Sequence, residues 1–173
     1  MKRTIYALCL IGVMATLVAG CGSSGDSTSA SAGNGSGGKP VSSSEDIPIA
    51  VVSAEKVGDL GKVLVDSEGR TLYVFHKDKR SLYSAKSSAC YGACAEAWPP
   101  LLTGGETEAG KGASPTKFSG LIRKDGALQV TYYGHPLYTY EGDKKPGEAN
   151  GNGVKAFGGE WTALGPYNEV PGD

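Results

Sequence analysis

Short apolar segments separated by turn residues dominate the chain beyond residue 47, and they predict strands rather than helices. Residues 62–66 and 71–75 flank the turn sequence Ser-Glu-Gly, and residues 120–123 and 127–132 flank Lys-Asp-Gly. Asp-Gly between two strand-like segments is a strong hairpin signal. The pattern therefore predicts an all-β fold that is built mainly from antiparallel hairpins.

Helical character is confined to one stretch of the chain. Residues 93–97 are rich in Ala, and Pro99 and Pro100 would end a helix there, because proline lacks the amide hydrogen and clashes with the preceding turn. The composition agrees, since 27 Gly and 9 Pro among 173 residues disfavour long helices. We expect one short helical turn near Cys94.

The chain matches itself at an offset of 65 positions, which becomes 63 further downstream, and this indicates a tandem repeat. We predict two copies of one β unit, at about 61–102 and about 120–165, packed as a single small domain. The matched pairs are Val65 with Val130, Gly69 with Gly134, Leu72 with Leu137, Tyr73 with Tyr138, Phe75 with Tyr140, Asp78 with Asp143, Trp98 with Trp161 and Leu101 with Leu164.

Each copy carries a Tyr-x-aromatic-x-x-Asp motif that is followed by a Trp. In a strand, Tyr73 and Phe75 point to one face, and Tyr138 and Tyr140 do the same in the second copy. Aromatic side chains bury large areas, so we expect these rings and the two Trp side chains to fill the core between the copies. The alternative is an exposed aromatic platform that binds a ligand.

The N-terminal residues have the form of a bacterial secretion signal. Lys2 and Arg3 precede an apolar run over residues 5–18, which is long enough for a signal peptide and too short to span a bilayer. The run leads into Ala-Gly-Cys, ending at Cys21, which resembles the lipobox of bacterial lipoproteins. We therefore expect a lipoprotein signal peptide over residues 1–20, with Cys21 acylated.

Two or more acyl chains would hold the protein durably on the extracytoplasmic side of the bacterial cell membrane. Residues 22–46 contain nine Ser and six Gly, so residues 21–46 are predicted to form a lipidated, disordered tether. The folded part is predicted to span residues 47–173, as a monomer. Loss of Lys2 and Arg3 with the signal takes the formal net charge from -1 to -3, which does not suit nucleic-acid binding.

The motifs resemble those of the secreted-repeat lipoprotein family of bacteria, which is named for Yx(FWY)xxD. The run Cys-x-Gly-x-Cys-x-x-x-Trp-Pro-Pro and the turn Gly-His-Pro-Leu-Tyr also occur in the order of that family. The resemblance implies a bacterial lipoprotein and brings no established biochemical role. The first copy matches at Tyr73, Phe75 and Asp78, with Trp98 after them, and the second at Tyr138, Tyr140 and Asp143, with Trp161 after them.

Cys90 and Cys94 are predicted to form a structural disulfide, since an isolated thiol pair normally oxidises outside the cytoplasm. A second interpretation combines the two cysteines with His76 and His135, the two histidines of the chain, in a metal-binding or redox-active site. The protein would then be an extracytoplasmic redox or metal-handling accessory. The leading interpretation includes no cofactor.

Asp78 and Asp143 end matching strands, so we expect each carboxylate to close the following loop by accepting backbone N–H bonds. Ser53 and Lys56 fit a Ser-x-x-Lys motif without its companion sequences, and no phosphate-binding loop occurs. We therefore expect a non-enzymatic, lipid-anchored module that binds an envelope or cell-wall ligand or supports the envelope.

Overall fold

The structure is a computed structural model of the chain, and it describes residues 47–81 and 84–169. The predicted signal peptide, the acylated Cys21 and the predicted tether lie outside the described residues, so they stay predictions. Within the described ranges, no helix is long and apolar enough to cross a membrane.

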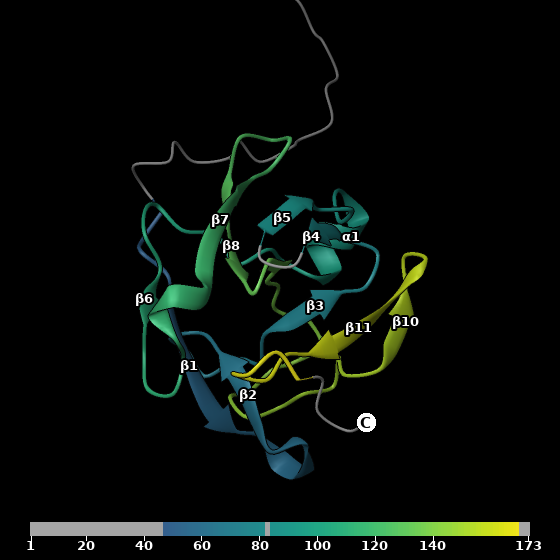
Figure 1. Ribbon diagram of the computed structural model, residues 1–173. Coiled ribbons are helices and arrows are strands. Elements are labelled where there is room, and N and C mark those ends of the chain that lie inside the picture. Colours follow the sequence, from purple (N-terminus) through teal and green to yellow (C-terminus); the bar gives the residue numbers. More distant parts are fainter. Residues whose placement is uncertain (1–46, 82–83, 170–173) are drawn as a thin grey trace, which may run out of the picture. The chain divides into compact units, whose positions relative to one another are not determined.

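The described residues form short strands in four small sheets (Figure 1). The first sheet has the order β2-β1-β6, in which β1 is antiparallel to β2 and parallel to β6. Its strands are β1 (Val51–Lys56), β2 (Lys62–Val65) and β6 (Glu108–Ala109), and the 3-10 helix η2 (Gly58–Leu60) lies between β1 and β2.

The other three sheets are antiparallel throughout. The all-β prediction is confirmed, and so is the short helix near Cys94, but helical turns are not confined to that stretch, because two 3-10 helices also occur among the described residues. The second sheet consists of β10 (Val154–Ala156), β11 (Gly159–Ala163) and β3 (Tyr73–Phe75) in that order. The third consists of β7 (Phe118–Ile122), β8 (Leu128–Tyr132) and β9 (His135–Pro136), with the 3-10 helix η3 (Pro115–Lys117) before β7. The remaining elements are the ribbon of β4 (Lys79–Ser81) with β5 (Ser84–Ser87), and the helix α1 (Ala93–Ala97).

The two copies meet in a local two-fold arrangement centred on Tyr73 and Tyr138. Tyr73 N donates to Tyr138 O at 2.8 Å, and Tyr138 N donates to Tyr73 O at 3.0 Å. The Tyr strand of each copy also pairs with the Trp segment of the other copy, since Phe75 of β3 lies opposite Trp161 of β11 and Tyr138 bridges to Pro100. The copies are therefore interlocked by exchanged strands.

Matching backbone hydrogen bonds show how closely the two copies correspond. His76 N donates to Glu160 O at 3.0 Å, and Glu141 N donates to Ala97 O at 3.0 Å. These four residues are related by the offsets of 65 and 63 positions that the sequence contains. The two bonds are therefore the same bond in the two halves, which supports the predicted tandem repeat.

One part of the predicted alignment is shifted by a residue. Leu72 N donates to Leu64 O, and Leu137 N donates to Val130 O, so the structural counterpart of Val130 is Leu64 rather than Val65. The hairpin turn of the first copy is one residue longer than that of the second. A comparison without gaps does not detect the extra residue, because Leu64 and Val65 are both apolar and both buried.

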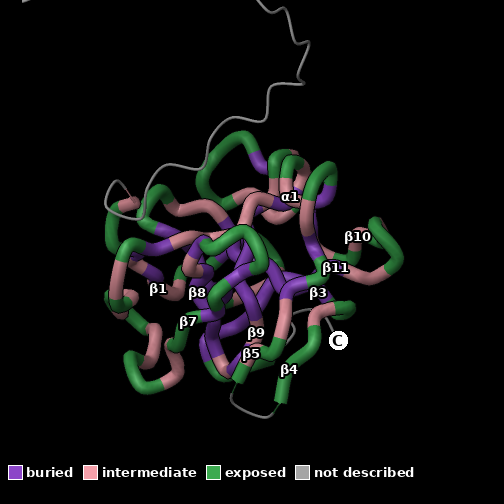
Figure 2. The backbone as a smooth tube through the Cα atoms, turned by 90° about the horizontal axis from the view of Figure 1, so that it is seen from above, coloured by how far each residue is buried: buried purple, intermediate pink, exposed green. Residues whose placement is uncertain are grey.

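The repeated aromatic rings lie in the core. Tyr73, Tyr138 and Trp161 are fully buried, and Trp98 and Phe75 are 1% and 2% exposed. The buried segments of β3, β8 and β9 come together in the middle of the domain (Figure 2). The structure therefore supports the interpretation that the rings form the core. The alternative interpretation, an exposed aromatic platform, is wrong for these five side chains.

Candidate functional site

The Tyr and Asp residues of the repeated motif bind across the copies. The Tyr73 hydroxyl donates to Asp143 Oδ2 at 2.6 Å, and the Tyr138 hydroxyl donates to Asp78 Oδ2 at 2.7 Å. Tyr and Asp of one copy are thus bonded to Asp and Tyr of the other. The sequence offset identifies the equivalent residues but does not show that they pair in this crossed manner.

The second oxygen of each carboxylate holds the loop that follows its strand. Asp78 Oδ1 accepts from Ala89 N at 2.7 Å, and Asp143 Oδ1 accepts from Asn150 N at 2.8 Å. The prediction that the two carboxylates close these loops through backbone N–H bonds is confirmed. Both oxygens of each motif carboxylate therefore have structural hydrogen bonds.

Burial changes the proton affinity of these pairs. It raises the pKa of Asp78 to about 6, although the Ala89 N–H, the Tyr138 hydroxyl and the Arg123 charge each act to lower it. Burial is also the main cause that raises the pKa of Tyr73 and that of Tyr138 well above the ordinary value for tyrosine. The two phenols therefore stay protonated and remain hydrogen-bond donors.

The aromatic residue at the third position of the motif, Phe75 or Tyr140, completes a stack of four rings. The ring of Phe75 lies 4.2 Å from Trp161, the two Trp rings lie 4.0 Å apart, and Trp98 lies 4.1 Å from Tyr140. Each outer ring therefore stacks on the Trp of the other copy. Tyr73 meets Trp98 edge-on at 5.3 Å, and Tyr138 meets Trp161 edge-on at 5.1 Å.

A close backbone approach fixes one glycine beside this stack. A Cβ atom at Gly151 would lie 2.7 Å from Trp98 Cη2 and 2.9 Å from Tyr73 Cζ. No side chain fits there unless the rings move. The motif residues and the loop that Asp143 holds therefore form one closely packed unit, which we call the aromatic interlock: Tyr73, Phe75, Asp78, Trp98, Tyr138, Tyr140, Asp143 and Trp161.

The predicted disulfide between Cys90 and Cys94 is confirmed, with its sulfur atoms 2.03 Å apart. Cys94 lies within α1, and both cysteines pack in the same hydrophobic cluster as Trp98. The backbone carbonyl of Cys94 also accepts from Trp98 N at 2.8 Å. The bridge therefore supports the segment that presents Trp98 to the interlock.

A buried arginine secures the other end of that segment. Arg123 is 4% exposed and donates to Cys90 O at 2.7 Å, to Gln129 Oε1 at 2.7 Å and to Ser88 Oγ at 3.2 Å. Its guanidinium carbon also lies 4.4 Å from the centre of the Tyr91 ring. The sequence did not predict this role, because Arg123 adjoins a polar hairpin turn and no local pattern marks it as buried.

Both histidines line one cavity of about 220 Å³, together with Asp78, Arg80 and Asn168. We call this cavity the histidine pocket. His76 directly follows β3 in the first copy, and His135 begins β9 in the second copy. The structure therefore brings together the two histidines that the sequence singled out, whereas Arg80 and Asn168 had no sequence signal.

The histidine pocket keeps one imidazole neutral. Burial, followed by the charges of Arg80 and His76, lowers the pKa of His135 to about 4, although a hydrogen bond with Asn168 acts in the opposite direction. Asn168 has a φ of 68°, in the left-handed region that few residues other than Gly adopt. An imidazole without charge can both donate and accept hydrogen bonds at neutral pH.

The structure does not assemble the metal site that combines cysteines with histidines. Cys90 and Cys94 are bonded to each other and do not line the histidine pocket. His76 Nε2 lies 2.9 Å from Thr162 Oγ1. Within residues 47–81 and 84–169, no three His, Cys, Asp or Glu side chains are grouped as metal ligands.

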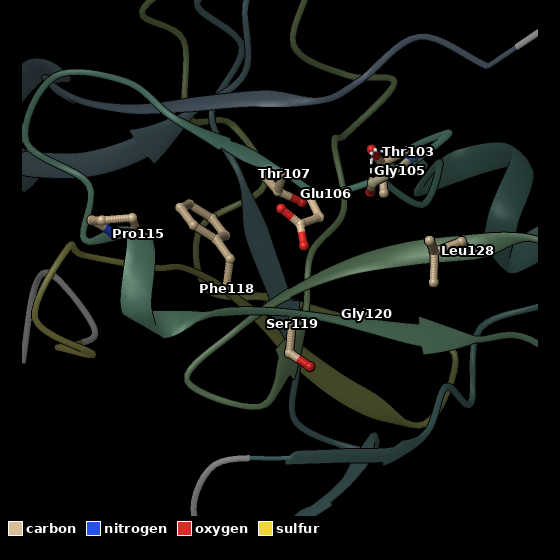
Figure 3. Close-up of a pocket in the computed structure, with 9 residues that line it drawn as sticks. All are labelled: Thr103, Gly105, Glu106, Thr107, Pro115, Phe118, Ser119, Gly120 and Leu128. Carbon is tan, nitrogen blue, oxygen red and sulfur yellow. Dashed lines mark hydrogen bonds between the residues drawn. The ribbon is translucent and has the colours of Figure 1, made fainter.

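A larger and more open cavity of about 610 Å³ lies beside β7 (Figure 3). The ring of Phe118 and the carboxylate of Glu106 extend into the same space, while Ser119 points the other way. Thr103 also lines this cavity, but its hydroxyl is bonded to the backbone at Ala50 and Gly105. The cavity therefore presents few free polar groups beside Glu106.

Two segments of the chain, residues 56–102 and 121–164, match a family described as a secreted repeat of unknown function. The chain belongs to this family. No curated protein and no solved structure matches it. The two matched segments contain the two halves of the aromatic interlock, so the family motif is the set of residues that joins one repeat to the other.

Proposed function

We propose that this protein is a lipid-anchored, extracytoplasmic binding module that holds a small anionic ligand in the histidine pocket without transforming it. The family description as a secreted repeat supports a location outside the cytoplasm. The lipobox-like sequence ending at Cys21 supports the anchor. The aromatic interlock is the scaffold that positions the pocket.

The observation that carries the proposal is the set of donors around the pocket. The Arg80 guanidinium lines the cavity and forms no ion pair with the described residues. His76 and His135 add imidazole groups on the same cavity, and Asn168 adds an amide. A guanidinium with neighbouring hydrogen-bonding groups suits a carboxylate or phosphate group, and the remaining ring nitrogens of the two histidines are available beside the bonds to Thr162 and Asn168.

The acidic group of the pocket is already bonded. Asp78 directs one oxygen to Tyr138 and the other to Ala89 N. Its raised pKa also makes its negative charge easier to neutralise when an anion arrives. Asp78 therefore opposes anion binding less than a free carboxylate would.

The arrangement of the interlock favours binding over catalysis. Tyr73, Tyr138, Asp78 and Asp143 carry the reactive groups of the motif, and their hydroxyl and carboxylate oxygens are all engaged in hydrogen bonds that hold the fold. Three of the four residues are also buried. They support a site rather than act on a substrate.

Thermal unfolding of the full-length protein with inorganic phosphate or acetate tests the proposal, with sodium chloride at equal ionic strength as the reference. An anion at ten times its Kd should raise the Tm by about 5 °C. Arg80→Gln should abolish the rise, while Lys86→Gln, which removes an exposed charge from β5, should preserve it. An equal rise in the Arg80→Gln variant, or no rise in the native protein, would contradict the proposal.

Metal handling is the second candidate function, because the histidine pocket holds both imidazoles. Zinc added to the full-length protein should then raise the Tm, and His76→Gln and His135→Gln should each remove the effect. A zinc response without a phosphate or acetate response would favour this candidate over the anion site.

A further inference from the structure

The hairpin of β10 and β11 extends away from the rest of the described residues (Figures 1 and 2). Ala156 lies opposite Gly159, so Phe157 and Gly158 form a two-residue turn at the tip. Phe157 is 44% exposed. It therefore presents an aromatic ring at the end of a projecting element.

The backbone of this turn is unfavourable for a phenylalanine. Phe157 has a φ of 55° and Gly158 a φ of 80°, as in a type I′ turn. Asn-Gly is the usual sequence there, because a side chain with bulk at Cβ is strained in the left-handed region. A strained residue that leaves much of its ring in solvent points to a function at the tip.

Positive charge lies next to the backbone of the turn. Lys77 Nζ donates to Phe157 O at 3.4 Å, and a Cβ atom at Gly158 would lie 3.1 Å from the same Nζ. Lys155 is exposed on β10, opposite Glu160 of β11. The tip therefore combines an aromatic ring with two lysines and one glutamate, which leaves it with a net positive charge, in a chain whose predicted mature form is negatively charged overall.

A bilayer surface suits this tip better than a protein partner does. A stable protein interface buries on the order of 1,000 Å² or more, which one ring does not provide. Burying the exposed part of one Phe ring favours the membrane about 30-fold. That gain is small for a free protein, but it is sufficient to orient a domain that is already held at the membrane.

We propose that the β10–β11 hairpin is a membrane contact that seats Phe157 in the interface of an anionic bilayer. Lys77 and Lys155 then lie against the anionic headgroups. The inference rests on the proposed acyl anchor at Cys21. The 25 residues between Cys21 and Ile47 have a contour length of up to about 85 Å, so the anchor permits the contact.

The test uses the full acylated chain in vesicles of three parts phosphatidylcholine and one part phosphatidylglycerol, with brominated acyl chains that quench tryptophan on contact. Phe157→Trp should add emission that the brominated lipid quenches. Ile122→Trp is the matched control, because Ile122 is 77% exposed on β7, and its emission should be insensitive. Equal quenching of the two variants, or none at position 157, would overturn the proposal.

A second variant separates contact from folding. Phe157→Asn relieves the turn, so it should raise the Tm by about 4 °C. A lower Tm would show that the ring supports the fold and would overturn the proposal. Lys77→Gln combined with Lys155→Gln should reduce the quenching of Phe157→Trp in anionic vesicles and leave it unchanged in vesicles of phosphatidylcholine alone.

Flotation of the same vesicles reports the anchor independently. If the native chain floats with the vesicles and the Trp at position 157 is not quenched, only the hairpin proposal fails. If the native chain does not float, the anchor proposed at Cys21 fails, and the hairpin proposal falls with it.

Discussion

Replacing Tyr73 by Phe removes one hydroxyl from the centre of the domain. That hydroxyl donates to Asp143 Oδ2 at 2.6 Å and accepts from Gly151 N at 3.3 Å. The ring itself is fully buried and can keep its edge-on contact with Trp98. The substitution therefore tests the hydrogen bond between the copies and leaves their packing in place.

The expected magnitude follows from the burial of Asp143. This residue is 7% exposed, and in the variant it would keep only the bond from Asn150 N, on its other oxygen. A buried carboxylate that loses a donor costs about 2 to 3 kcal/mol, more than the ~1 kcal/mol of an ordinary hydrogen bond. For a domain of this size that loss lowers the Tm by about 10 °C.

Urea unfolding of the full-length protein, followed by tryptophan emission, measures this loss, because Trp98 and Trp161 both lie in the ring stack. Tyr167→Phe is the control, since Tyr167 is 80% exposed and its variant should stay within about 0.5 kcal/mol of the native protein. Asp143→Asn and the double variant with Tyr73→Phe complete a mutant cycle. The coupling free energy should reach at least about 1 kcal/mol.

Two results would refute this reasoning. A loss below about 0.5 kcal/mol in Tyr73→Phe would show that the Asp143 carboxylate finds a replacement donor at little cost. Additive effects of the two single variants would show that the pair does not act as a unit. Either outcome would remove the crossed Tyr–Asp bonds as a cause of the interlock.

Two further predictions rest on the structure, and one on the sequence. Removing the disulfide with Cys90→Ala and Cys94→Ala should lower the free energy of unfolding by about 2 kcal/mol, measured in urea. Folding raises the pKa of Asp78 from 3.8 to about 6, so the contribution of Asp78 to stability is lost as the pH rises through 6. Folding lowers the pKa of His135 from 6.5 to about 4, so the contribution of His135 is lost as the pH falls through 4. Urea midpoints between pH 4 and 6.5 should therefore rise with pH in Asp78→Asn and fall with pH in His135→Asn. Cell fractionation should find Cys21→Ala in the soluble fraction, and continued membrane retention would contradict the anchor.

Local signals in the sequence were sufficient for the strands beside the two predicted turns, for the disulfide and for the aromatic content of the core, but not for β1, β4, β5, β6 and β10. Asp-Gly marked the hairpin of β7 and β8, and the alternation around Tyr73 and Phe75 placed both rings on one face. Because an isolated thiol pair oxidises outside the cytoplasm, the disulfide between Cys90 and Cys94 could also be predicted. Each of these features depends on residues within about ten positions of one another, where spacing and side-chain chemistry decide the outcome.

Contacts between distant segments were not accessible in the same way. A self-comparison shows that Tyr73 and Tyr138 are equivalent, but it does not show that each binds the Asp of the other copy. Arg123 is buried by tertiary packing, although it directly precedes the polar turn Lys-Asp-Gly. The extra residue in the first hairpin turn was also hidden, because Leu64 and Val65 are alike in chemistry and burial.

The repeat also distinguishes symmetric from asymmetric positions around the histidine pocket. Equivalent backbone bonds match His76 with Glu141, and the hairpin bridges match His135 with Arg70. Arg70 is paired with Asp66 at 2.8 Å, whereas the groups that act on His135 are Arg80, Asn168 and His76.

Residues of the aromatic interlock are the same or similar in both copies, because each contacts a motif residue of the other copy. Positions that differ between the copies, such as His76 and Glu141, are free of that constraint. This asymmetry agrees with the proposed ligand site in the pocket rather than in the repeated motif.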